Sequence, residues 1–201
     1  MGKDRFTIII FVLILIVTCA AVKAQSNSSK DLEYKLKAAF LYNFIKFVDW
    51  PEKKETNDNN TIIIGIIGKS NFGDAFVPVQ EKKVKGQKTV IQYFKSFREL
   101  EKSKNDLNNA SEEMKKCHLL FICSSENDDL PDILNIVKNN NVLTVGETGD
   151  FLKTGGIINF LLEENKVRFE INLIAARDAK LTIRSQLLRL AQRVIDENGS
   201  K

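Results

Sequence analysis

The chain has 201 residues, of which 43% are hydrophobic and 28% charged, and its formal net charge is +4 at pH 7. This composition is typical of one globular domain with a real core, and it excludes a disordered, collagen-like or multi-span membrane protein. Removing residues 1–24, which hold Lys3, Arg5 and Lys23 against Asp4, leaves a net charge of +2. A surface so evenly balanced gives no electrostatic reason to expect a nucleic-acid partner.

The first 24 residues have the order of a secretory signal peptide. A short basic segment precedes an apolar run over 6–17 and the small residues of 20–24, so we expect cleavage before Gln25. A membrane anchor needs about 20 apolar residues, and Lys23 interrupts this run too early. Acylation of Cys19 is the less favoured alternative, because Thr18 stands where a lipoprotein carries Gly, Ala or Ser.

A polar leader (25–30) precedes a predicted helix over 31–48, which ends at Trp50-Pro51 because the residue before a proline disfavours the helical conformation. Tyr42 lies off its apolar face, and we interpret it as a contact for a cleft or a partner. Apolar spacing of three and four residues defines that face, which consists of Leu36, Phe40, Phe44 and Phe47.

Four strands follow in the middle of the chain, and helical or helix-length segments connect them. Strands joined in this way form a parallel sheet with right-handed crossovers. The strands are expected over 62–67, 88–94, 117–123 and 142–145, with a short helix at 74–79, a weak helix within 96–116 and a helix at 130–139.

The pattern then changes to a β-hairpin, with strands over 157–162 and 167–173 around the turn 163–166. An amphipathic helix with Ile183, Leu187, Leu190, Ala191 and Val194 on one face is expected to close the chain. The predicted fold is therefore a single α/β domain over 31–196, a mainly parallel sheet flanked by helices with an antiparallel hairpin at one edge, followed by a polar tail (197–201).

The mature chain keeps two cysteines, Cys117 and Cys123, in one predicted strand. At about 3.3 Å per residue their Cα atoms would be about 20 Å apart, beyond the reach of a disulfide. We therefore expect no disulfide within the chain, and both residues to remain buried thiols. The same spacing excludes a metal site with His118, whose side chain would point to the opposite face.

No catalytic site is predicted, and neither a metal nor a cofactor. The segment Gly65–Ser70 resembles a phosphate-binding loop, but that motif needs a glycine where Ile63 stands. A Gly-x-Ser-x-Gly elbow is absent, and the single histidine lies in a predicted strand. The paired carboxylates 128–129 and 163–164 are typical of solvated turns and helix starts.

Several motifs together resemble the YfiR-like family, in the same order over nearly the whole mature chain. They are Tyr34–Phe47 followed by Trp50-Pro51, 66–68, 117–122, 142–145, Gly155–Phe160, Val167–Asn172 and the Leu187-Leu188-x-Leu190-Ala191 segment.

The resemblance implies a non-catalytic periplasmic regulator of a Gram-negative bacterium. Such a protein binds the periplasmic sensing domain of an inner-membrane diguanylate cyclase and holds it inactive until stress or redox change releases cyclic-di-GMP synthesis. A sensor histidine kinase is an alternative partner, and a homodimer is compatible with the sequence.

Family members also carry disulfides. Here Gly65 stands in the first-strand position that would pair with Cys117, and Leu152 and Asn159 replace a second pair.

The resemblance also implies a small-effector site formed by the end of the first helix and the start of the last. The residues concerned are Asp49, Trp50, Thr182 and Arg184, with Tyr42, Glu170 and Asn172 as further candidates. Arg184 would clamp a carboxylate or phosphate with two hydrogen bonds; the alternative is a solvated residue in the first turn of the closing helix. Glu170 and Asn172 alternatively cap loops. A different function is also open: a periplasmic small-molecule binding protein with no enzyme partner.

Overall fold

A computed structural model describes residues 29–51, 61–80, 82–197 and 199–200. The predicted signal peptide (1–24), with Cys19, and residues 25–28 of the polar leader lie outside these ranges. Within the described part of the chain, no helix is both long enough and apolar enough to cross a membrane.

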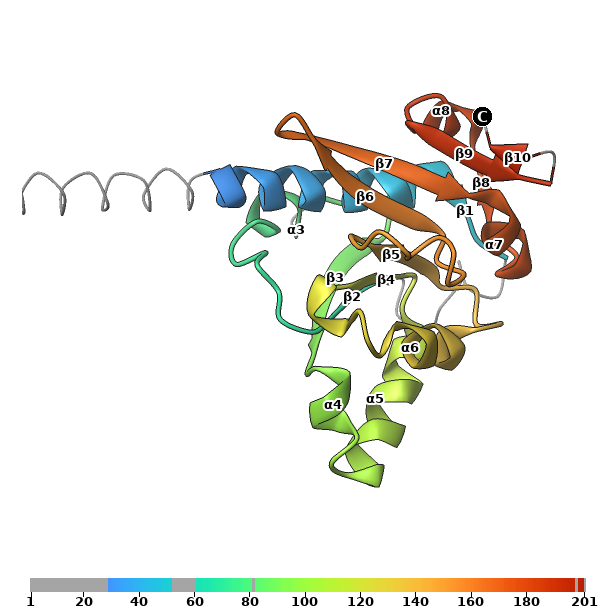
Figure 1. The fold of residues 1–201 in the computed structure, drawn as a ribbon. Helices are drawn as coiled ribbons and strands as arrows, with labels where there is room; N and C mark the ends of the chain where they lie inside the picture. The colour runs from blue at the N-terminus through green and yellow to red at the C-terminus, as the bar shows by residue number, and fades with distance from the viewer. Residues whose placement is uncertain (1–28, 52–60, 81, 198, 201) are drawn as a thin grey trace, which may run out of the picture.

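One eight-stranded sheet runs through the molecule in the order β10-β9-β7-β6-β5-β4-β2-β3 (Figure 1). Its five strands from β3 to β6 are parallel, β7 is antiparallel to β6, β9 is parallel to β7, and β10 is antiparallel to β9. The predicted α/β class, with a mainly parallel sheet and an antiparallel hairpin, is confirmed. The strands are β2 (Thr61–Ile67), β3 (Lys88–Phe94), β4 (Leu119–Ile122), β5 (Leu143–Gly146), β6 (Ile158–Glu163), β7 (Lys166–Asn172), β9 (Arg193–Asp196) and β10 (Gly199–Ser200).

Helices cover both faces of the sheet. The N-terminal helix, described over 29–47, packs on one face, and α4, α5 and α6 lie together on the other (Figure 1). A separate two-stranded sheet joins β1 (Val48–Asp49) to β8 (Thr182–Ile183). The helices that follow the N-terminal one are α3 (Val77–Gln80), α4 (Phe97–Leu100), α5 (Lys104–Lys116), the 3₁₀ turn η1 (Ser124–Glu126), α6 (Leu130–Val137), α7 (Leu173–Asp178) and α8 (Ser185–Leu188).

The N-terminal helix is anchored by aromatic rings. Phe44 packs against Phe169 and Phe160 with ring centroids 5.0 and 5.6 Å apart, and Phe40 contacts the same two rings. Such pairs add about 0.5–1.5 kcal/mol each beyond the area they bury. The expected face is only partly right, because Leu36 is 43% exposed. The buried stripe instead runs through Tyr34, Lys37, Ala38, Leu41, Tyr42, Phe44, Ile45 and Val48.

The predicted closing helix over 183–194 is wrong. Only the single turn of α8 is helical, and the chain then forms β9, which pairs in parallel with β7 and sets Glu170 opposite Arg193. Without β9 the outer edge of β7 would expose its backbone groups. The β-branched pair Val194-Ile195 also suits a strand. The hairpin therefore lies inside the sheet, and its outer side is covered by β9 and β10.

The order of the parallel strands reverses between β2 and β4. From β2 the chain passes to β3 on one side, then returns to β4 on the other side of β2 and continues to β5 and β6. Loops after β2 and β4 therefore face each other at the carboxyl end of the sheet, where open α/β sheets usually place their sites. Here that place is filled by the protein's own side chains, among them Lys37 and Glu147.

Candidate functional site

The β1–β8 pairing brings together the predicted effector residues. Asp49 lies directly opposite Thr182, and the backbone N–H of Arg184 donates to the Phe47 carbonyl at 2.9 Å. Trp50 follows β1 in the chain. Four residues expected together from the resemblance, Asp49, Trp50, Thr182 and Arg184, thus lie around one short ladder between the end of the first helix and the start of α8.

Opposite charges meet at this ladder. The guanidinium of Arg184 donates to both carboxylate oxygens of Asp49, from Nε at 2.9 Å and from Nη2 at 2.7 Å. Lys85 adds a contact at 3.1 Å to the same carboxylate and donates to the Val48 carbonyl at 3.0 Å. These hydrogen bonds, above all those from Arg184, lower the pKa of Asp49 to about 2. Arg184 is therefore engaged in a two-pronged carboxylate contact.

Trp50 forms the buried wall of the site. Its side chain is 7% exposed, and its indole N–H has no hydrogen-bond acceptor among the described residues. The Lys85 ammonium lies 5.5 Å from the Trp50 ring centroid, and the His118 ring packs edge-on at 5.8 Å. A buried donor without an acceptor costs free energy of about 1–3 kcal/mol. We call the group formed by Asp49, Trp50, Lys85, Thr182 and Arg184 the ladder site.

Sequence reasoning missed Lys85. It belongs to a lysine-rich turn, 82–88, and the sequence does not indicate which of these lysines reaches the ladder. Its place at the ladder depends on the turn closed by the Val84–Gln87 bridge, where Lys85 takes a left-handed conformation with φ of 50°.

Protonation of Asp49 is expected to occur only in strong acid. The folded-state pKa of about 2 lies below its ordinary value of 3.8, so the contact with Arg184 stabilises the ladder fully above pH 4 and is lost as the pH falls through about 2. A ¹³C NMR titration of the Asp49 carboxyl carbon checks this expectation. Arg184→Gln should move the midpoint up towards 3.8, and a parent midpoint already near 3.8 would contradict the geometry.

The other predicted site residues lie elsewhere. Tyr42, expected on a cleft or surface, is 6% exposed and donates to the Lys83 carbonyl at 3.1 Å. Glu170 is paired with Arg193 of β9 at 2.5 Å. Asn172 caps α7 by accepting from the Ala175 N–H, as the capping alternative for this residue predicted. These three side chains take structural partners and do not join the ladder site.

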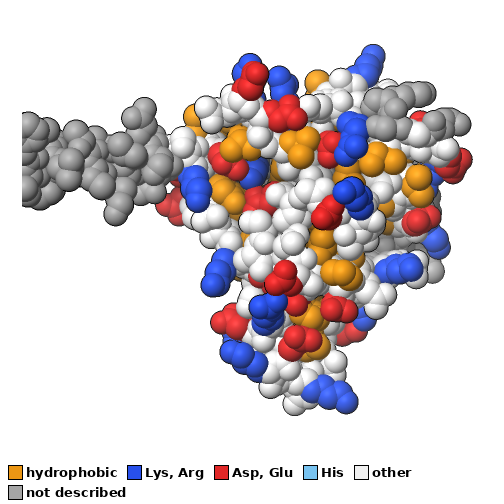
Figure 2. All heavy atoms as spheres, in the orientation of Figure 1, with side chains coloured by type: hydrophobic (Ala, Val, Ile, Leu, Met, Phe, Trp, Pro, Cys, Tyr) orange, Lys and Arg blue, Asp and Glu red, His pale blue; other side chains and the backbone are white. Residues whose placement is uncertain are grey.

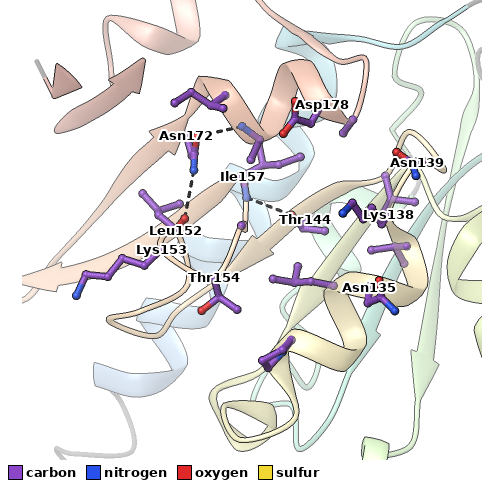
Figure 3. Close-up of a pocket in the computed structure, with 18 residues that line it drawn as sticks. Asn135, Lys138, Asn139, Thr144, Leu152, Lys153, Thr154, Ile157, Asn172 and Asp178 are labelled. Atoms are coloured by element: carbon purple, nitrogen blue, oxygen red, sulfur yellow. Dashed lines mark hydrogen bonds between the residues drawn. The ribbon is translucent and has the colours of Figure 1, made fainter. Parts of the chain in front are cut away.

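A second concave region lies between α6, α7 and the segment before β6. It has a volume of about 570 Å³, and its walls mix apolar side chains such as Leu152 and Ile157 with Asn135, Lys138 and Asp178 (Figure 3). Two of its inner polar groups are already paired. Asn172 donates to the Leu152 carbonyl, and Thr144 accepts from the Ile157 N–H. This groove has the size of a small-molecule site.

A buried ionic network fills the carboxyl end of the sheet. The Lys37 ammonium lies 2.6 Å from Glu147 and 2.5 Å from Glu33, and the Tyr34 hydroxyl donates to both Glu147 oxygens at 3.1 Å. The Ser124 N–H donates to Glu147 as well. This network ties the N-terminal helix to the loops after β4 and β5. The feature of the sequence that could have revealed this network is Lys37, a lysine within the buried stripe of the N-terminal helix.

The Gly68-Lys69-Ser70 turn is held by carboxylate and hydroxyl groups. The Lys69 N–H donates to Ser125 Oγ at 2.9 Å, and a Cβ on Gly68 would come within 2.5 Å of Glu126. Glu126 is itself buried and accepts from the Phe97 N–H. A carboxylate against this turn would repel a phosphate. Among the described residues no cluster of three or more His, Cys, Asp or Glu is arranged to hold a metal ion.

Cys117 and Cys123 are both buried thiols. Burial, followed by the nearby charges of Glu147 and Glu126, raises the pKa of Cys123 to about 12. A Cβ placed on Gly65 would lie 2.8 Å from Cys117 Sγ. Positions 65 and 117, which the resemblance pairs by a disulfide in other family members, are therefore neighbours in this chain. Because position 65 is a glycine here, it has no sulfur with which Cys117 could form that disulfide.

Gly65→Cys is expected to form a disulfide with Cys117 under mild oxidation. The 2.8 Å separation is close to the distance of about 3 Å between a Cβ and the far sulfur of a disulfide. Leu120 and Phe94 side-chain atoms, both 2.9 Å from that Cβ, must shift slightly. Intact mass before and after oxidation would reveal the loss of two hydrogens, with Gly65→Ser as the control. In the variant without residues 1–24, one thiol, Cys123, should stay open to alkylation after unfolding of the oxidised protein, and three open thiols, at positions 65, 117 and 123, would contradict this expectation.

The YfiR/HmsC-like family model matches residues 34–192. No curated protein matches. One similar solved structure is a conserved domain protein from Vibrio cholerae O1 biovar El Tor, with 11% identity and a TM-score of 0.47. Another is an ABC domain in complex with L-Trp from Streptococcus pneumoniae, with 13% identity and a TM-score of 0.47. The alignments cover 66% and 67% of this chain and about half, 54% and 55%, of those structures.

Proposed function

The chain belongs to the YfiR/HmsC-like family, and on that premise we propose that it binds the external domain of an inner-membrane diguanylate cyclase and holds the enzyme inactive. Members of this family are periplasmic regulators of diguanylate cyclase. The observation that carries the proposal is the family match itself, which spans residues 34–192. Repression by binding requires that the regulator prefer one state of its partner.

The ladder site is the part of the surface that we propose to receive a signal. The indole N–H of Trp50, which has no acceptor among residues 29–51, 61–80, 82–197 and 199–200, would be satisfied by an acceptor on an effector or on the partner. Arg184 and Lys85 supply positive charge beside it, held in place by Asp49. An anionic group that competes with Asp49 for the guanidinium would loosen the β1–β8 ladder and so change the surface offered to the partner.

The proposal includes no catalytic step. The family consists generally of non-catalytic regulators, and the buried carboxylates Glu126 and Glu147 are each engaged with backbone N–H groups. We further propose export to the periplasm by cleavage before Gln25.

Cross-linking in living cells tests the proposal. The tagged mature protein is treated with a lysine-reactive cross-linker, and captured envelope proteins are identified by mass spectrometry. We expect one inner-membrane diguanylate cyclase with an external domain. Trp50→Ala and Arg184→Ala variants are expected to weaken its capture. Arg177→Ala is the matched control, because Arg177 is a second exposed arginine in an ion pair, with Glu197 at 2.7 Å, and that pair includes no residue of the ladder site.

Capture of a sensor kinase instead would support the proposed repression, with the kinase in place of the cyclase as the partner. If no signalling protein is recovered with either the parent protein or the control variant, the repressor proposal fails.

One observation favours a second candidate, a periplasmic small-molecule binding protein without an enzyme partner. The groove of about 570 Å³ beside α6 and α7 is large enough for a metabolite. Native mass spectrometry of the protein purified from the periplasm distinguishes the two functions. A stoichiometric bound molecule together with no captured signalling protein would favour the binding protein.

A further inference from the structure

The sheet has two very different edges. At one end β10 contains two residues, Gly199–Ser200, whereas at the other end β3 contains seven, Lys88–Phe94. On one side β3 pairs with β2 over its whole length. No described strand pairs with its other side, where every second residue directs its N–H and C=O outward. A long edge of this kind is a template for another strand.

The side chains of β3 do not blunt this edge. Proteins usually protect an edge strand with lysine, proline, a bulge or an inward-pointing charge; in β3 only Lys88, at the very start of the strand, is of this kind, and the interior 89–94 contains none. Val90 and Tyr93 are 48% and 54% exposed, on opposite faces of the strand. An added strand would cover both faces of the edge with apolar contacts, in addition to backbone hydrogen bonds.

Lysines mark both ends of this edge. Lys88 begins the strand and Lys95 follows it, both are exposed, and neither enters an ion pair among the described residues. Carboxylates lie beside the middle of the strand, Asp74 near Tyr93 and Glu113 near Gln92, and charges of both signs are interspersed on the face shown in Figure 2; the lysines are distinguished by their place at the two ends of β3. Antiparallel pairing of two copies of β3 would set Lys88 of each copy at or beside Lys95 of the other. Like charges directly opposite destabilise a strand pair, so the edge is unsuited to a second copy.

We propose that β3 is the docking edge for an extended segment of the signalling partner's external domain, which adds a strand beside Lys88–Phe94 and carries acidic residues near its ends. This inference rests on the proposed function and assigns it a surface. The added strand would gain its affinity from backbone hydrogen bonds, and its register from contacts to Val90 and Tyr93. Carboxylates facing Lys88 and Lys95 would speed association and reject neutral or basic strands.

Photo-cross-linking from single positions tests the docking edge. A photoreactive phenylalanine analogue is placed at position 90 or 93 in the full chain expressed in cells, and at Leu162 as a control. Leu162 is 55% exposed and lies in β6, which three strands separate from β3. We expect adducts from positions 90 and 93, and none from 162, that map to an extended acidic segment of the inner-membrane protein captured by the lysine-reactive reagent.

Charge reversal supplies the second arm. The double variant Lys88→Glu, Lys95→Glu is expected to reduce capture about tenfold. The charge-matched variant Lys102→Glu, Lys104→Glu, in exposed positions at the start of α5, should leave capture unchanged. Thermal unfolding of both variants checks that each is folded.

The outcomes separate the two proposals. The docking edge is overturned if the lysine-reactive reagent captures the signalling protein but positions 90 and 93 give no adduct and the charge reversal leaves capture unchanged. The repressor function is kept in that case. Adducts from these positions to a second copy of the chain also overturn it. If even the lysine-reactive reagent captures no signalling protein, the proposed function fails and the docking edge fails with it.

Discussion

Replacing Lys37 with methionine is expected to lower the free energy of unfolding by about 3–5 kcal/mol at pH 7, the cost of breaking a buried ion pair. Lys37 and Glu147 have side chains only 6% and 7% exposed, and their charged atoms are 2.6 Å apart. Without the ammonium the Glu147 carboxylate stays buried, and within the described part of the chain only the Tyr34 hydroxyl and the Ser124 N–H still donate to it. Methionine keeps the length of the side chain and isolates the effect of the charge.

Urea denaturation measures this difference, and Lys153→Met is the control. Lys153 is also paired with a carboxylate, Asp150 at 2.9 Å, but the two side chains are 82% and 75% exposed. Its loss should cost less than about 1 kcal/mol. Adding Glu147→Gln to Lys37→Met should recover part of the stability, because it removes the isolated charge. A Lys37→Met variant no less stable than the Lys153→Met control would mean that the network is solvated.

The second large effect is expected at the loop that leads into β6, where Gly156→Ala should destabilise the fold by about 3 kcal/mol. A Cβ at position 156 would come within 2.1 Å of the ring of Phe151, and one at Gly146 within 2.2 Å of the same ring. Phe151 is only 1% exposed and belongs to the core on the side of α4, α5 and α6. The ring is enclosed between the two glycines and cannot retreat without opening that core.

Gly149→Ala provides the comparison within the same loop. No atom lies within 4 Å of a Cβ placed there, so we expect a change of less than about 0.5 kcal/mol. Circular dichroism measures the melting temperatures of the two variants, and we expect that of Gly156→Ala to be the lower. Equal melting temperatures would show that Phe151 moves without cost, and the close packing described here would then be wrong.

Much of the fold was predictable because the parallel strands are nearly continuous apolar runs. The run over 62–67 and the alternation over 88–94 correspond to β2 and β3 within one residue, and the hairpin around 163–166 lies where the pattern placed it. Each of these signals is local, since burial on both faces or on one face leaves a direct mark on the sequence.

The end of the chain was not predictable in this way. Residues 183–194 have a helical apolar period, but the open side of β7 accepts the β-branched residues of β9 as a strand. Long-range pairing overrode local propensity there. The apolar face of the first helix was misjudged for a related reason. Burial of Lys37 depends on Glu147, which lies 110 residues away in the chain, so no local pattern reports it.

The ladder site shows both what the resemblance supplied and what it lacked. The resemblance predicted that Asp49 and Arg184 lie at one site, and in the structure their charged groups are 2.7 Å apart. It did not supply Lys85, nor the buried indole N–H of Trp50 that has no acceptor among the described residues. Tyr42, Glu170 and Asn172, chosen for residue type and position, take structural partners instead. Of these three, Asn172 also lines the groove beside α6 and α7.

The most direct test of the central claim, repression of a diguanylate cyclase, is the cellular level of cyclic-di-GMP. The nucleotide is quantified by mass spectrometry in cells that lack this protein and in cells that express the parent chain, Arg184→Ala or Arg177→Ala in its place. The account predicts a rise on deletion, full reversal by the parent chain and by Arg177→Ala, and weaker reversal by Arg184→Ala. A cyclic-di-GMP level that neither rises on deletion nor falls when the protein is overproduced would contradict it.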